Sequence, residues 1–95
     1  NKINETLSRI PVDPSDDNNN DKQILRAAII AEFDAINLYE QMAANVKDKD
    51  IKKVLLDIAK EEKTHVGEFE ALLKNFDKEH EKELENGEDE VKELK

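Results

Sequence analysis

The strongest constraint on the fold is a pair of apolar stripes, each interrupted near its middle by charged residues. Apolar side chains recur at alternating steps of four and three, the period of helices that pack in a bundle. The first stripe lies on a helix expected from about residue 21 to about residue 46, and the second on a helix expected to end near residue 75. We therefore predict an all-α fold. The first stripe is Leu25, Ile29, Glu32, Ile36, Tyr39, Ala43 and Val46, and the second is Ile51, Leu55, Ile58, Glu62, His65, Phe69, Leu72 and Phe76.

A short polar break at residues 47–50 separates the two helices. Asp48 or Asp50 can cap the second helix, because a carboxylate accepts hydrogen bonds from the first free backbone N–H groups. So short a connection predicts an antiparallel two-helix hairpin. One hairpin cannot cover both of its apolar stripes. We therefore expect two hairpins to dimerise into a four-helix bundle.

The chain divides into three predicted regions. Residues 1–20 are expected to form a flexible N-terminal arm, since prolines and a run of Asp and Asn offer little to bury. Residues 21–76 form the predicted hairpin, and residues 77–95 a polar C-terminal helix or tail. Asn20 followed by Gln23 resembles a capping box at the start of the first helix.

The predicted third helix is very polar. Asp77 can cap it, and it is expected to end near Gly87, with residues 88–95 either helical or frayed. His80 lies on no apolar stripe, so we expect it to be exposed to solvent. Gly67, inside the second helix, favours a close approach of another helix over simple tolerance.

Composition limits how such a chain can be stabilised. The chain has 95 residues, of which 37% are hydrophobic and 41% charged, and it has no cysteine. Small polar domains usually need disulfides, a metal or a partner chain, and only the last two remain open here. The net charge of −9 disfavours nucleic acid and anionic membranes as partners.

No apolar run is long enough to span a bilayer, and no secretory signal is evident. The sequence starts at Asn1 rather than Met, which suggests a trimmed chain.

Glu32, Glu62 and His65 are the polar members of the stripes that need partners, because an unpaired buried carboxylate is costly. Glu62 and His65 are three positions apart and share a helix face, and an antiparallel hairpin places Glu32 opposite His65. Carboxylates and imidazole suit iron, manganese or zinc. One chain offers three ligands and a symmetric dimer six, with four negative charges that two divalent ions would cancel. This is the di-metal pattern of four-helix bundles.

Less specific readings of these residues remain open. A buried Glu can simply fix the register of a bundle, and a lone Glu-x-x-His pair is a weak motif. Tyr39 either contacts the metal ligands or serves as an amphipathic core residue whose hydroxyl reaches water. A second apolar stripe suggests a further subunit contact and an assembly larger than a dimer. It comprises Ile30, Phe33, Asn37 and Ala44 on the first helix and Val66 and Leu73 on the second.

Two segments carry a family resemblance that covers roughly residues 22–76. IIAEFDAINLYEQMA (residues 29–43) and VLLDIAKEEKTHVGEF (residues 54–69) resemble the encapsulated ferritins. The resemblance implies half-ferritin subunits that dimerise into a ferritin-like four-helix bundle and complete a ferroxidase centre. It implies two iron ions per dimer interface and a decameric ring of five dimers. Such rings oxidise ferrous iron in the lumen of an encapsulin nanocompartment in the cytoplasm, and the encapsulin shell protein holds the product. The implied iron ligands are Glu32, Glu62 and His65, with Tyr39 beside them.

The chain departs from the family pattern in two places. Members often carry further acidic and aromatic residues beside the metal-binding Glu and Tyr, where this chain has Ala31 and Leu38. Asp34 is the acid that remains, so it is the candidate for a metal access path. The ending, residues 88–95, does not look like a shell-targeting peptide. It resembles the junction of members fused to a shell protein, so we expect a truncated domain.

The sequence therefore predicts a ferroxidase that transfers electrons from Fe(II) to dioxygen. A rubrerythrin-like peroxide reductase shares the ligand scheme, but such proteins commonly carry a rubredoxin module with cysteines, and this chain has none. A non-catalytic helical assembly module, in which the polar residues only set register, is the third reading.

Overall fold

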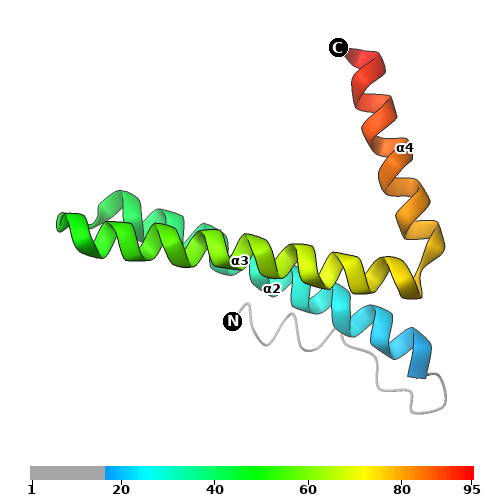
Figure 1. Cartoon of the computed structure of the whole chain (residues 1–95), viewed down its shortest axis with the longest axis horizontal. Coiled ribbons are helices and arrows are strands. Elements are labelled where there is room, and N and C mark those ends of the chain that lie inside the picture. The colour runs from blue at the N-terminus through cyan, green and yellow to red at the C-terminus, as the bar shows by residue number, and fades with distance from the viewer. Residues whose placement is uncertain (1–16) are drawn as a thin grey trace.

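The computed structural model describes residues 17–95, which form three helices and no strand. These are α2 (Asp17–Asn45), α3 (Lys49–Phe76) and α4 (Lys78–Leu94). The long helices α2 and α3 lie side by side and antiparallel, and α4 leaves the far end of the hairpin at a steep angle (Figure 1). The predicted all-α class is confirmed. Of the predicted N-terminal arm, residues 1–16 lie outside the described residues.

The first helix begins earlier than predicted. The chain is already helical at Asp17, so Asn20 lies inside α2 and the predicted capping box with Gln23 is wrong. Neither Gly nor Pro lies between Asp17 and Asp21, so neither prevents the helix from beginning before the predicted start. Acidic residues in a first turn are also favoured by the positive end of the helix dipole.

The turn of the hairpin is short and capped. Asp48 ends the connection, and its carboxylate accepts hydrogen bonds from the backbone N–H groups of Asp50 and Ile51, both at 2.9 Å. The preceding helix closes with the N–H of Val46 bonded to the carbonyl of Met42 at 3.0 Å. Of the two predicted caps Asp48 is therefore the one used, and the antiparallel hairpin is confirmed.

Asp77 joins α3 to α4, as the C-cap of the first helix and the N-cap of the second. Its backbone N–H closes α3 on the Leu73 carbonyl at 2.9 Å, and its carboxylate caps α4 by accepting from the His80 N–H at 3.0 Å. The other carboxylate oxygen pairs with Arg26 of α2 at 2.7 Å. The His80 N–H, helped by the Arg26 guanidinium, holds the pKa of Asp77 below its ordinary value. The junction is therefore tied to both long helices.

Two predictions about the C-terminal helix are wrong. α4 does not end near Gly87 but continues to Leu94, since a helix tolerates one glycine at modest cost. His80 is half-buried, and its Nε2 lies 3.0 Å from Glu70 Oε2. The bend at Asp77 brings His80 of α4 close to Glu70 of α3. The periodicity of a single helix cannot indicate a contact between two helices.

The interior of the hairpin is narrow. Its buried side chains are Ile29, Ile36 and Ala43 on α2 and Ala59 and Leu73 on α3. The α2 residues are the predicted ones, whereas on α3 the buried line lies one position beyond the predicted stripe. Leu73, predicted to face a further subunit, is 1% exposed, because it packs inside its own hairpin.

Gly67 does not mark a close helix contact among the described residues. A Cβ atom built on it would meet nothing within 4 Å. The predicted close approach is therefore not made by α2, and the glycine leaves an open position on the surface of α3. No helix in the described part of the chain is both long and apolar enough to cross a membrane.

Candidate metal centre

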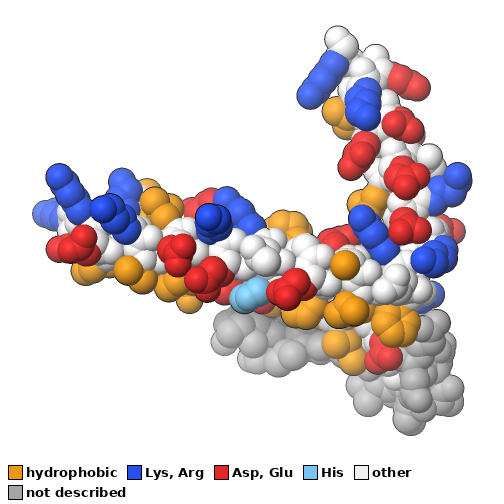
Figure 2. Space-filling model, in the orientation of Figure 1, with side chains coloured by type: hydrophobic (Ala, Val, Ile, Leu, Met, Phe, Trp, Pro, Cys, Tyr) orange, Lys and Arg blue, Asp and Glu red, His pale blue; other side chains and the backbone are white. Residues whose placement is uncertain are grey.

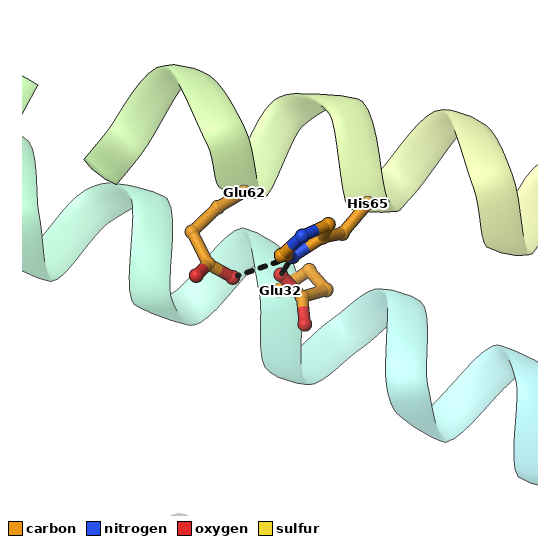
Figure 3. Close-up of side chains that lie close together, drawn as sticks. All are labelled: Glu32, Glu62 and His65. Carbon is orange, nitrogen blue, oxygen red and sulfur yellow. Dashed lines mark ion pairs between the residues drawn. The ribbon is translucent and has the colours of Figure 1, made fainter. Parts of the chain in front are cut away.

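Three side chains from the two long helices converge on one point. Nδ1 of His65 lies 3.4 Å from Oε2 of Glu32 and 3.6 Å from Oε2 of Glu62 (Figure 3). One ligand atom from each residue lies within 4.8 Å of the other two. Glu62 and His65 meet because residues three apart on α3 share a face, and Glu32 meets them because the turn sets the register of α2. Among the described residues this is the one such group of three.

The cluster lies at the edge of the hairpin rather than in its interior. The side chains of Glu32 and Glu62 are 20% and 19% exposed, and that of His65 is 45% exposed. Oε2 of Glu32 is fully shielded from solvent yet accepts no hydrogen bond. Nδ1 of His65, 3.4 Å away, forms an ion pair with this oxygen only when the imidazole is protonated. A shielded carboxylate oxygen that accepts no hydrogen bond costs about 1–3 kcal/mol. A cation beside Glu32 would compensate this oxygen.

The donor set fits a divalent transition metal. Two carboxylates and one imidazole are the ligands that iron, manganese and zinc accept, and without thiolates a softer ion has no preference for the site. Three side chains do not complete four- to six-fold coordination. An ion bound by these three side chains would take its remaining ligands from water or from another chain.

The other residues proposed from the sequence lie outside the cluster. Tyr39 is half-buried on α2, two turns beyond Glu32 on the same side. Asp34 is exposed and does not belong to the group of three. Ala31 and Leu38, the neighbours of Glu32 and Tyr39 in the sequence, are exposed as well.

A second ion pair joins the helices near the cluster. Lys63 Nζ lies 3.1 Å from Glu40 Oε2, linking the residue after Glu62 with the residue after Tyr39. Both side chains are largely exposed, at 60% and 46%, so the pair stabilises the hairpin little. Sequence reasoning missed it because neither residue lies on an apolar stripe. The signal available was their opposite charge and their matching places in the hairpin register.

Comparison with known proteins places this arrangement in a family. The family model described as rubrerythrin matches residues 23–95. A ferritin-like–encapsulin shell fusion protein of Pyrococcus furiosus is 64% identical over 72 residues, which are 76% of this chain and 21% of that protein. The chain thus spans about a fifth of the length of this curated relative.

A solved structure agrees in both sequence and fold. The crystal structure of an encapsulated ferritin domain from Pyrococcus furiosus superposes with a TM-score of 0.76 at 63% identity, covering 77% of this chain and 74% of that one. Both the fold and most of the sequence are therefore shared along most of both chains. The chain belongs to the rubrerythrin family of ferritin-like proteins and, within it, to the encapsulated ferritins.

Proposed function

We propose that this chain is a ferroxidase whose di-iron centre is completed by two copies. The observation that carries the proposal is the convergence of Glu32, Glu62 and His65, with one Glu32 oxygen shielded and without a hydrogen-bond donor. A carboxylate in that state needs a proton or a cation. Ferrous iron is both a suitable cation and the substrate of the proposed reaction.

An exposed apolar row beside the cluster supports the second copy. Ile51, Val54, Leu72 and Phe76 are 52%, 58%, 49% and 40% exposed. They lie seven, eleven and fourteen positions from His65, which places all of them on its face of α3. Figure 2 shows hydrophobic side chains gathered along this edge of the hairpin. A second hairpin packed here in two-fold symmetry would cover the row and form a four-helix bundle.

The same symmetry would bring together two sets of ligands. Two Glu32, two Glu62 and two His65 would then surround two ions, and four carboxylates would balance two divalent charges. Carboxylate oxygens can bridge two ions, whereas each imidazole binds one. Each chain alone would hold half of the centre, so dimerisation becomes a condition of activity.

The residues of this chain bind, neutralise and shield the substrate. When bound, iron supplies the electrons, and dioxygen accepts them. Glu32 and Glu62 bind as carboxylates and His65 binds as neutral imidazole, so acidification should weaken binding. The apolar row would restrict water around the site once it is covered. We propose that Tyr39, one heptad beyond Glu32, hydrogen-bonds a ligand or stands beside the metals as a redox-capable ring.

The relatives support a compartment in which the oxidised iron would be held. The Pyrococcus protein is, by its name, a fusion of a ferritin-like domain with an encapsulin shell. We infer that this chain works in the lumen of an encapsulin compartment in the cytoplasm, with the shell protein as its partner and a decameric ring as its assembly. Asp34, exposed on α2, would lie on the path by which iron reaches Glu32.

One competing activity has its own support. The matching family model is described as rubrerythrin, so hydrogen peroxide is a candidate oxidant in place of dioxygen. The two activities differ in oxidant and not in ligands. Turnover measured separately with dioxygen and with hydrogen peroxide, at equal iron loading, would distinguish them.

Iron oxidation in air tests the proposal. Fe(II) is mixed with the protein and Fe(III) is followed by absorbance, for the wild type and for Glu32→Ala. The proposal expects the variant to fall to the rate of iron without protein. A variant as fast as the wild type would show that the site is elsewhere, and an oligomer indifferent to iron and to EDTA would favour a scaffold.

A further inference from the structure

Asn86 and Gly87 form the one Asn-Gly pair of the sequence, and both residues are exposed on α4. An asparagine followed by glycine is the arrangement in which a backbone nitrogen most readily attacks the side-chain amide before it. Glycine has no Cβ to obstruct the attack, and its backbone adopts conformations that other residues avoid. Asparagine is also among the residues that are chemically least stable to heat. The pair is therefore a candidate for spontaneous modification.

The helical conformation opposes this reaction. In α4 the backbone N–H of Gly87 points to the backbone carbonyl of Glu83, four residues before it. The side-chain amide of Asn86 is tied to the same residue, since its Nδ2 donates to Oε2 of Glu83 at 2.8 Å and to Oε1 at 3.2 Å. The helical backbone at Asn86 also keeps its side chain away from the position in which a ring could close. The reaction therefore requires this turn of α4 to open.

The distal half of α4 has little to hold it closed. No residue of α4 is buried. Among the described residues, the ion pairs that tie this end of the chain to the hairpin are those of Asp77 and His80, at the start of the helix. Beyond them α4 projects away from α2 and α3 (Figure 1). Short helices without packed side chains are marginally stable in water, and a glycine weakens them further. We therefore expect the turn around Asn86 to open more often than the turns of α3.

We propose that Asn86 is a site of spontaneous deamidation, protected while α4 is helical and reactive when the distal half of α4 opens. The backbone nitrogen of Gly87 loses its proton and attacks Cγ of Asn86. A C–N bond forms, the bond between Cγ and Nδ2 breaks, and ammonia leaves. Water then opens the resulting succinimide ring at one of its two carbonyls. The products are aspartate and isoaspartate, and no oxidant or reductant takes part.

Each product changes α4. Both carry a carboxylate where the asparagine was neutral, which adds a negative charge to a helix that already has eight acidic residues and three lysines. Isoaspartate also puts an extra carbon atom into the backbone, so the regular hydrogen bonds of the helix cannot continue through it. Val91 and Leu94, exposed beyond the modified position, would then lose their fixed place relative to the hairpin. These changes are confined to α4 and do not depend on iron or on the proposed activity.

Peptide mass spectrometry of the full chain tests the proposal. The protein is incubated at mildly alkaline pH, and deamidation of each asparagine is followed over time. Asn75 is the internal control, because it is exposed and helical but is followed by Phe76. We expect Asn86 to deamidate at least about tenfold faster than Asn75 and to yield both isoaspartate and aspartate, and Gly87→Ala to remove this difference. Equal rates at Asn86 and Asn75, or aspartate as the sole product at Asn86, would overturn the proposal.

Two proline variants test the protection by the helix. Glu90→Pro leaves the Asn-Gly pair intact, but the proline ring would clash with the backbone carbonyl of Asn86, four residues before it, and open that turn. We expect the deamidation rate of Asn86 to rise at least about tenfold. Lys78→Pro is the matched control and should leave the rate unchanged, because the first position of a helix tolerates proline and Asp77 before it is already extended. A rate in Glu90→Pro no higher than in Lys78→Pro would contradict the proposal.

Discussion

The imidazole Nδ1 of His65 lies 3.4 Å from Oε2 of Glu32, across the two long helices of the hairpin. The contact exists because the capped turn at Asp48 sets the register of α2 against α3. It brings ligand-type atoms from both helices to one point at the edge of an exposed apolar row. The proposed function depends on this relationship more than on any other in the chain.

The substitution Glu62→Gln should abolish most of the iron oxidation. The amide keeps the size of the side chain and loses the negative charge that binds a cation, so we expect the rate to fall by at least about 100-fold. Glu61→Gln is the matched control, because Glu61 is exposed and outside the cluster. Stopped-flow absorbance of Fe(III) measures both. Equal losses in the two variants would point to a general effect of charge rather than to a ligand.

Leu73→Ala should destabilise the single chain, whereas Leu72→Ala should not. Leu73 is 1% exposed and Leu72 is 49% exposed. Removing a buried leucine costs about 2–5 kcal/mol, while exposed positions usually change stability by less than about 0.5 kcal/mol. Urea unfolding of dilute protein in EDTA measures this difference.

The same two variants separate folding from assembly. If the exposed row is the dimer contact, Leu72→Ala should raise the dissociation constant of the dimer in sedimentation while the unfolding of dilute protein is unchanged. An equal loss of unfolding free energy in both variants would mean that the two residues are buried together in solution.

Local rules predicted much of this architecture. Periodicity located both long helices, and turn length gave the register of Glu32 against His65. Side-chain chemistry identified Asp77 as one cap and left the other open between Asp48 and Asp50. Periodicity did not locate the buried line on α3. Two helices in contact bury only a narrow strip, and the wider predicted stripe would be buried only in a bundle.

The other predictions that failed concern features that tertiary contacts determine. His80 is half-buried because the bend at Asp77 brings it to Glu70 of a different helix. Asn20 fails as a cap because Asn and Asp also tolerate the first turns of a helix that starts earlier. Neither outcome is contained in the residue pattern around the position itself.

Gly67→Ala should stabilise the dilute, metal-free chain. Gly67 is helical, has open space where a Cβ would stand, and loses more backbone entropy on folding than alanine does. We expect a gain of about 0.5–1 kcal/mol in the free energy of unfolding, measured with urea. A loss of stability would reveal a neighbouring chain packed against the glycine.

Acid should weaken the junction between α3 and α4 through Asp77. Its pKa is lower in the folded chain than in the unfolded chain, chiefly because the His80 N–H bonds the carboxylate and further because Arg26 does. The stabilisation is therefore fully present above the ordinary aspartate value, about 3.9, and is lost as the pH falls through the lower folded value. Asp77→Asn should flatten this part of the stability profile, as measured by urea unfolding from pH 6 to about pH 2.

Arg26 provides the control for this pH dependence. Arg26→Gln should retain the cap on α4 and lose only the ion pair, so its profile should lie between those of the wild type and Asp77→Asn. Identical profiles for the wild type and Asp77→Asn would show that other carboxylates account for the acid sensitivity.

The most direct test of a centre shared between two chains is a structure of the iron-soaked protein. We expect two ions at the interface of two hairpins, held by Glu32, Glu62 and His65 of both. Iron held by the three residues of a single chain with no partner ligand, or iron bound away from Glu32, would show that the centre is not shared between two chains.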